Sequence, residues 1–275
     1  MLGYASLQVT ETASRPLCVA LLGLGEAGTA FADDLVSVGV PTAGWDPAPS
    51  GSVSGLRRAE SAADAVEGAD LVLSLNSGAS ALAAAKAAAA ALSSRTLYAD
   101  LNTTGIALKQ EVAAVVRSAG ASFADVALLA PVPGRGIRTP ALASGDGAAR
   151  YAEILRPLGA SVDVVGPEPG AAAARKLLRS VFMKGLAAAV LESLAASEAA
   201  GCADWLRADI AATLQGADES LAARLVDGST QHAVRRVAEM EAAADLLREL
   251  GVEPHVARAA ADVLRGLPQP SRVEP

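Results

Sequence analysis

Short apolar runs alternate with longer segments of helical periodicity along the first part of this chain. Strands are expected at 17–22, 42–45, 71–75, 96–100, 123–128, 141–144 and 162–165, and helices at 26–38, 80–92, 106–119 and 148–158. Several of the strand segments are apolar throughout, which is typical of strands covered by helices on both faces. This alternation is the pattern of βαβ units, so it predicts an α/β domain with a parallel, doubly wound sheet.

Helical patterns alone fill the chain after the Gly- and Pro-rich segment 166–170. Residues 171–200 contain no Pro and a single Gly, Gly185. We therefore expect one long helix, of about 45 Å at the usual rise per residue. Further helices are expected at 204–214, 218–225, 229–250 and 254–264. The second part of the chain is therefore predicted to be all-α.

Composition excludes several classes of protein. A chain with 52% hydrophobic, 19% charged and 3% aromatic residues forms a packed core and is not an all-β protein. The net charge is −7 and no Lys/Arg run is longer than two, so no basic surface for nucleic acid or anionic lipid is expected. No signal peptide, membrane span or metal site is predicted, and Cys18 and Cys202 are interpreted as reduced thiols of a cytoplasmic protein. The expected partner is a small molecule.

A glycine-rich turn follows the first predicted strand and opens the first predicted helix. Its residues are Gly23, Leu24, Gly25, Glu26, Ala27 and Gly28. In this setting Gly23 allows the tight turn, Gly25 lets a pyrophosphate approach the backbone, and Gly28 lets the helix pack closely on the strand. Glycines also end ordinary strands, but the strand and helix around this turn favour a dinucleotide-binding Rossmann domain.

The ends of the next strands supply further candidates for cofactor binding. Asp46 lies 18 residues beyond Gly28, near the spacing of about 20 expected for the carboxylate that binds the ribose 2′-hydroxyl. This carboxylate favours NAD, since it would repel a 2′-phosphate, while Arg57 and Arg58 keep NADP as the alternative. Asp46-Pro47 is also an ordinary way to begin a turn. The remaining candidates are Ser74, Leu75, Asn76, Asn102 and Thr103.

Four segments of the chain resemble, in order, motifs of the β-hydroxyacid dehydrogenase family, the relatives of 6-phosphogluconate dehydrogenase. They are the turn 23–28, the strand-end segment Asp100-Leu101-Asn102-Thr103-Thr104, the substrate loop Ala130-Pro131-Val132-Pro133-Gly134, and the helix motif Lys176-Leu177-Leu178-Arg179-Ser180. The short second domain and the sequence 179–185 are similar to a poorly characterised branch of this family. The resemblance therefore extends over nearly the whole chain.

The resemblance implies an N-terminal Rossmann domain, a long interdomain helix and an all-α C-terminal domain that commonly forms homodimers. We expect a disordered N-terminal extension at 1–16, the Rossmann domain at 17–169, the helical substrate and dimerisation domain at 170–266, and a tail at 267–275.

Lys176 is the expected catalytic residue, because the family lysine acts as acid and base at the carbinol oxygen during hydride transfer. A free lysine has a pKa near 10.4, so burial in a cleft would be needed to lower it. Lys176, Ser180 and Lys184 are four residues apart and share one helical face, which makes Lys184 the second candidate. The alternative is a solvated cluster of basic residues. Packing of this helix is favoured by its apolar neighbours Leu177, Leu178, Val181, Phe182 and Met183.

Two positions depart from the family pattern. Ser180 stands in place of an asparagine, and Pro133 stands in place of a loop serine, which removes a hydroxyl and an amide donor. These changes argue against the familiar small hydroxyacids as substrates. Gly134 remains, and Arg135 and Arg138 flank the loop either as a clamp for a carboxylate or phosphate or as surface arginines.

His232 shares a polar helical face with Arg236 and Glu239. One hypothesis is that this face closes over the substrate from the second domain or from a partner subunit. The alternative is an exposed helix with ordinary salt bridges.

Together these features predict an NAD(P)-dependent oxidoreductase. It would transfer a hydride between the nicotinamide and a carbonyl or hydroxyl of a small, anionic substrate, as 3-hydroxyacid dehydrogenases do, with Lys176 as general acid/base. An imine reductase on the same fold is one alternative, although such enzymes usually replace the lysine. A dinucleotide-binding protein without catalytic activity is the other.

Overall fold

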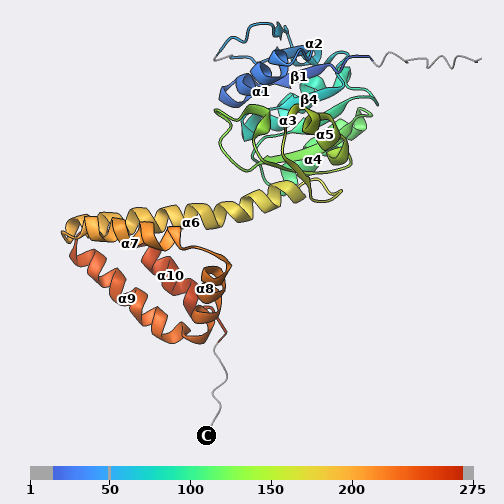
Figure 1. The fold of residues 1–275 in the computed structure, drawn as a ribbon. Coiled ribbons are helices and arrows are strands. Elements are labelled where there is room, and N and C mark those ends of the chain that lie inside the picture. The colour runs from blue at the N-terminus through green and yellow to red at the C-terminus, as the bar shows by residue number, and fades with distance from the viewer. Residues whose placement is uncertain (1–14, 49–50, 269–275) are drawn as a thin grey trace, which may run out of the picture. The chain divides into compact units, whose positions relative to one another are not determined.

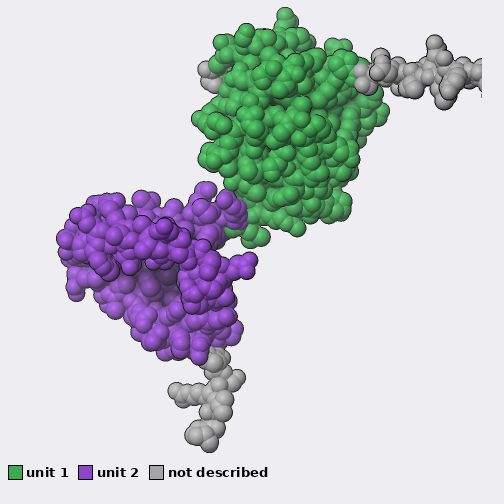
Figure 2. Space-filling view, viewed as in Figure 1, with its two compact units in different colours: residues 1–178 green, residues 179–275 purple. Residues whose placement is uncertain are grey.

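The computed structural model describes residues 15–48 and 51–268, and the chain divides into two compact units, Met1–Leu178 and Arg179–Pro275 (Figures 1 and 2). All but two residues of the predicted N-terminal extension, and all but two of the predicted tail, lie outside the described residues. The predicted fold class is confirmed, since a Rossmann-like sheet is followed by a long helix and an all-helical region.

The described part of the first unit contains an eight-stranded sheet with the order β3-β2-β1-β4-β5-β6-β7-β8. The strands are β1 (Val19–Leu22), β2 (Thr42–Trp45), β3 (Arg57–Arg58), β4 (Leu71–Ser74), β5 (Leu97–Asp100), β6 (Ser122–Leu128), β7 (Ala141–Ser144) and β8 (Val162–Val164). β1, β4 and β5 are buried along their whole length, as their apolar sequences predict.

One strand departs from the predicted parallel sheet. β7 runs antiparallel to β6, with Leu128 paired to Ala141. The connection between these strands contains the short 3-10 helix η3 (Gly136–Arg138) and no α-helical crossover, so the chain returns directly alongside β6. The two-residue strand β3 and the short helix α2 (Ala62–Val66) were not predicted, because segments of this length carry no readable periodicity.

Helices cover both faces of the sheet (Figure 1). They are α1 (Glu26–Ser37), α2, α3 (Ala81–Ala88), α4 (Ile106–Ser118) and α5 (Ala148–Leu155). Phe31 of α1 and Tyr151 of α5 belong to the core on one face. Ala85 of α3 and Val112 of α4 belong to the core on the other face. Two separate cores of this kind define a doubly wound sheet.

The long helix α6 (Ala171–Ala199) is unbroken and about 44 Å long at the usual rise per residue (Figure 1). It begins after Gly170, whose φ of +96° is a left-handed conformation that favours glycine. The first turns of α6 belong to the first unit and the rest to the second. This division differs from the predicted boundary at residue 170, which places the whole helix in the second domain.

The second unit continues with α7 (Ala203–Gln215), α8 (Glu219–Gln231), α9 (Ala233–Glu249) and α10 (His255–Arg265). The predicted break between 225 and 229 is wrong, because α8 continues through Gly228 to residue 231. The hydroxyls of Ser229 and Thr230 donate to carbonyl oxygens one turn earlier, within the same helix. The break falls at His232, where the backbone leaves helical geometry.

Candidate functional site

The glycine-rich turn after β1 has a backbone that only glycine fits at two of its positions. A Cβ on Gly23, whose φ is +102°, would overlap the carbonyl oxygen of Leu75. A Cβ on Gly28 would overlap the carbonyl oxygen of Gly23. A Cβ on Gly25 would meet no atom within 4 Å. The packing of the protein therefore requires Gly23 and Gly28, while the space at Gly25 leaves room for a ligand to approach the backbone.

A cavity of about 580 Å³ opens beside this turn. Its lining residues come from the turn, the ends of β2 and β4, and α3: Gly25, Glu26, Ala27, Trp45, Asp46, Pro47, Leu75, Asn76, Ser77, Ser80, Ala83, Ala84 and Ala87. The carboxylate of Asp46 accepts hydrogen bonds from the Leu24 amide at 2.7 Å and the Ala48 amide at 2.8 Å. The predicted ribose-binding carboxylate therefore lies against the glycine turn, and Leu24 takes part through its backbone because its side chain is buried.

Arg57 and Arg58, the two arginines that support NADP as the alternative cofactor, have different surroundings. Arg57 pairs with Asp64 at 2.8 Å, and the Glu60 amide and this guanidinium hold the pKa of the Asp64 carboxyl below its usual value. Arg58 is exposed and lies in register with Gly44 of β2, the neighbouring strand. Arg58 is therefore better placed than Arg57 to meet an added phosphate.

A second cavity, of about 420 Å³, shares part of its lining with the first. Its lining residues are Glu26, Ala27, Leu75, Asn76, Leu101, Asn102, Thr103, Leu128, Ala130, Pro131, Val132, Pro133 and Lys176. Glu26, Ala27, Leu75 and Asn76 line both cavities, so one groove crosses the carboxyl ends of the strands. Open α/β sheets bind their ligands at this edge.

Lys176 reaches this second cavity from the second turn of α6. Its ammonium donates a hydrogen bond of 2.8 Å to the Thr103 hydroxyl. Thr103 follows the carboxyl end of β5, and Pro133 lines the same cavity from the loop after β6. The structure thus brings together residues of the strand-end, substrate-loop and helix motifs that lie far apart in the sequence.

Ser74 lies behind the groove instead of facing it. It is fully buried at the end of β4 and accepts hydrogen bonds from the side-chain amides of Asn76 at 2.9 Å and Asn102 at 3.1 Å. Both asparagines line the second cavity, so Ser74 orients two of the predicted cofactor-binding side chains.

A buried charged cluster that is not among the predicted site residues lies beneath this groove. Lys109 of α4 is 1% exposed and forms salt bridges of 3.2 Å with Asp100 and 3.1 Å with Asp125. The signal was present in the sequence, because Lys109 shares the buried face of its helix with Val112 and Val116. Tyr98 lies on β5, the strand that also carries Asp100. It is buried, and this burial raises the pKa of its phenol.

The residues that follow Lys176 on α6 lie mostly at the surface. Ser180 is half-buried and Lys184 is exposed, and both belong to the second unit. The interpretation that apolar neighbours pack this helix within one chain is wrong. All five are exposed: Leu177, Leu178, Val181, Phe182 and Met183.

The two arginines around the substrate loop are engaged with protein groups. Arg138 pairs with Asp34 of α1 at 3.3 Å, and the same carboxylate accepts the Ile137 amide at 2.9 Å. Arg135 donates to the Pro131 carbonyl at 3.4 Å. Neither arginine is among the residues that line the groove, and Gly134 turns the exposed loop with a φ of +74°.

His232 is exposed at the junction of α8 and α9 in the second unit. On α9, Arg236 donates to the Ser229 hydroxyl at 2.6 Å, and Arg235 pairs with Glu239 at 3.3 Å. The predicted polar face therefore carries local contacts between α8 and α9 and within α9.

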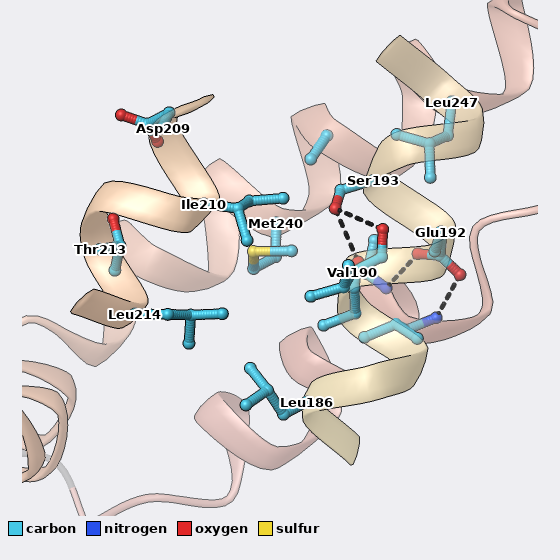
Figure 3. Close-up of a pocket in the computed structure, with 14 residues that line it drawn as sticks. Leu186, Val190, Glu192, Ser193, Asp209, Ile210, Thr213, Leu214, Met240 and Leu247 are labelled. Atoms are coloured by element: carbon cyan, nitrogen blue, oxygen red, sulfur yellow. Dashed lines mark hydrogen bonds between the residues drawn. The ribbon is translucent and has the colours of Figure 1, made fainter. Parts of the chain in front are cut away.

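The second unit has a cavity of its own, of about 440 Å³, between α6, α7, α9 and α10 (Figure 3). Figure 3 shows Leu186 and Val190 of α6 facing Ile210 and Leu214 of α7 across it. At its wall, Glu192 accepts the Val256 and Ala257 amides at the start of α10, at 2.7 and 2.9 Å. No pattern in the sequence predicts this apolar cavity.

Across residues 15–48 and 51–268, no group of three or more His, Cys, Asp or Glu side chains is arranged to hold a metal ion. Within the same ranges, no helix is long and apolar enough to cross a membrane.

The sequence matches two known domain families. Residues 18–166 match the NAD binding domain of 6-phosphogluconate dehydrogenase, and residues 196–267 match DUF1932, a domain of unknown function. The first match covers more than half of the chain. No curated protein matches the chain.

Several solved structures share the fold. A conserved hypothetical protein from Sinorhizobium meliloti 1021 is 32% identical over 92% of this chain and 88% of its own, with a TM-score of 0.62. The protein MTH1747, of unknown function and described as similar to 3-hydroxyacid dehydrogenases, is 27% identical over 90% of this chain and 97% of its own, with a TM-score of 0.61. The imine reductase of Myxococcus stipitatus in complex with NADP+ is 23% identical over 91% of this chain and 93% of its own, with a TM-score of 0.77.

Proposed function

We propose that this protein is a dehydrogenase or reductase of small anionic substrates. The proposal starts from its family, because the chain belongs to the proteins that carry the NAD binding domain of 6-phosphogluconate dehydrogenase. It would transfer a hydride between the nicotinamide of NAD(P) and a carbonyl or hydroxyl carbon. The observation that carries this proposal is the position of Lys176, whose ammonium lies 2.8 Å from Thr103 in the groove that begins at the glycine turn.

The residues of the groove fit a dinucleotide. The open space at Gly25 accommodates a pyrophosphate, and the amides at the start of α1 favour its charge. The larger cavity, with Asp46 in its lining, is suited to the adenosine half, and the cavity with Lys176 to the nicotinamide half. The bound cofactor would donate or accept the hydride, and the protein supplies position and proton transfer.

Asp46 supports a preference for NAD. Each of its carboxylate oxygens already accepts one backbone amide, and a carboxylate oxygen has a second acceptor position for a ribose hydroxyl. A 2′-phosphate at the same place would be repelled by the carboxylate. Exposed Arg58 on β3 is the feature that keeps NADP as the second cofactor.

Lys176 is the proposed general acid/base. In the reductive direction its ammonium gives a proton to the substrate oxygen as the carbonyl carbon accepts the hydride, and the reverse reaction returns the proton. The Thr103 hydroxyl holds the Nζ atom at the groove. Ser180 and Lys184 remain the further catalytic candidates, and Arg135 and His232 remain candidates for substrate contacts.

Replacement of Lys176 by Met tests this role. Turnover should fall by a factor of about 100 or more, which is the usual contribution of a general acid, while NADH binding stays within about twofold of the parent protein. Binding is measured by NADH fluorescence titration, and turnover by NADH or NADPH oxidation with oxoacids, aldehydes, phosphorylated carbonyls and cyclic imines. Lys86→Met, on the exposed face of α3, is the matched control. Unchanged turnover in Lys176→Met would remove this residue from the mechanism.

The same substrate panel distinguishes the alternatives. Imine reductases share this fold, and one of the similar structures is an imine reductase variant in complex with NAD+, which favours including cyclic imines. Turnover of imines alone would replace the dehydrogenase proposal by an imine reductase. Failure to bind either cofactor would remove the enzyme proposal.

We also propose a homodimer located in the cytoplasm. Leu178, Val181 and Phe182 follow one another at helical spacing on α6 and are 71%, 74% and 64% exposed. Apolar side chains gathered in this way usually mark an interaction surface, and a second copy of the chain carries the same face. Cys18 and Cys202 are free thiols, in keeping with a reducing compartment.

A further inference from the structure

A lysine is buried between two aspartates directly beneath the proposed active site. The Lys109 ammonium lies 3.2 Å from Asp100 and 3.1 Å from Asp125, and it also donates to the Asp100 backbone carbonyl at 2.7 Å. All three side chains are at most 1% exposed. Buried ion pairs of this kind rarely stabilise a fold more than apolar side chains of similar size would, so stability alone does not account for the cluster.

Asp125 connects this cluster to the start of α6. Its second carboxylate oxygen accepts the amides of Gly170 at 3.1 Å and Ala173 at 3.0 Å, and the Ser144 hydroxyl at 3.2 Å. Ala173 precedes Lys176 by about one helical turn. The position of Asp125 therefore determines where α6 begins and where the Lys176 side chain starts.

Asp100 connects the same cluster to the loop that receives the Lys176 ammonium. Its carboxylate accepts the Asn102 backbone amide at 3.0 Å and the Asn102 side-chain amide at 2.6 Å. The next residue, Thr103, accepts the hydrogen bond from Lys176. Lys109 thus joins the helix that carries the proposed acid/base to the loop that holds its amine.

We propose that Lys109 is a positioning residue that keeps Lys176 against Thr103. This inference rests on the proposed function of Lys176. Lys109 compensates one of the two carboxylate charges, and the amides at the start of α6 compensate the other. Without the ammonium, the bridge between Asp100 and Asp125 is lost, so the loop is no longer tied to the start of α6 and the Lys176 amine loses its fixed position.

The reactivity of the Lys176 amine tests this inference without any substrate. The chain has four lysines, at positions 86, 109, 176 and 184, so competitive acetylation by acetic anhydride, read by mass spectrometry, reports each of them. In the parent protein Lys176 should react several-fold more slowly than exposed Lys86 and Lys184. In Lys109→Met it should approach their rate, and kcat should fall by a factor of about 10 or more with KM for NADH little changed.

Two further variants separate positioning from folding. Lys109→Met combined with Asp100→Asn restores the net charge of the cluster but not the bridge, so it should fold and keep the raised Lys176 reactivity. Lys109→Arg, which keeps a buried cation, should recover part of kcat. Circular dichroism and the stoichiometry of NADH binding give the folded fraction for each variant.

The experiments distinguish failure of the positioning role of Lys109 from failure of the proposed oxidoreductase function. Unchanged Lys176 acetylation and unchanged kcat per folded molecule in the double variant would overturn the positioning role. Raised acetylation without hydride transfer to any compound of the panel, in the parent as well, would uphold the positioning role and overturn the proposed function.

Discussion

At the scale of single residues, Gly28 and Gly25 of the turn have different reasons for being glycine. Gly28 is required by the protein's own backbone, since a Cβ there would overlap the Gly23 carbonyl oxygen. Gly25 has a φ of −73°, which any residue adopts, and open space around it. The fold therefore does not require Gly25, whereas the proposed pyrophosphate would need the space beside it.

Alanine at these two positions should give opposite results. Gly28→Ala should lower the free energy of unfolding by about 1–3 kcal/mol, as overpacked sites do. Gly25→Ala should leave that free energy nearly unchanged and weaken NADH binding by about tenfold or more, because its methyl group occupies the space meant for the pyrophosphate. Chemical denaturation and NADH fluorescence measure the two effects. Normal NADH binding by Gly25→Ala would exclude a pyrophosphate at this turn.

The position of Asp46 could be predicted from the sequence, whereas the partners of some charged residues could not. The spacing of Asp46 from the glycine turn predicted its place, because strand ends in a parallel sheet meet at one edge. The partners of Arg138 and Lys109 could not be predicted in this way. Arg138 meets Asp34 and Lys109 meets Asp125 across different elements, and only the assembled sheet brings these charges together.

At the scale of elements, the start of α10 is capped by a side chain from another helix. Its N-cap residue is Pro254, and no side chain of α10 caps its first amides. Glu192 of α6 accepts two of them instead, which satisfies donors that a helix start leaves open. The carboxylate also interacts favourably with the positive end of the helix.

Removal of this carboxylate should destabilise the second unit. Glu192→Ala should lower the free energy of unfolding by about 1–3 kcal/mol, because two charge-assisted hydrogen bonds are lost. Glu192→Gln keeps one acceptor oxygen and should show a smaller effect. Thermal unfolding and hydrogen exchange of the α10 amides measure both variants, with Glu198→Ala, an exposed carboxylate later on α6, as control. Equal stability of Glu192→Ala and the parent would show that α10 does not depend on this cap.

At the scale of the whole molecule, the exposed apolar face of α6 is the feature that a single chain does not explain. Val181 and Phe182 are 74% and 64% exposed. Contact between water and these apolar side chains is unfavourable in free energy. In the proposed homodimer, a second copy of the chain would cover this face and remove it from water.

Charge on this face should prevent association. Val181→Glu and Phe182→Glu should each weaken the dimer by about 100-fold, since each places an unpaired carboxylate in an apolar interface. Sedimentation velocity measured over a range of concentrations reports the result. Val38→Glu, at an exposed apolar position after α1, is the matched control and should leave the assembly unchanged. A parent protein that sediments as a monomer would remove the homodimer proposal.

The sequence by itself determined the features that depend on local pattern. Apolar runs, helical periodicity and the glycine turn predicted most strands and helices, the Rossmann domain and the family, because each signal lies within a few residues of chain. The tertiary structure decided the direction of β7, the cap on α10, the burial of Lys109 and the exposure of the apolar face of α6. These depend on partners such as Asp125 and Ala173, which are 48 residues apart and meet only when the sheet and α6 are assembled.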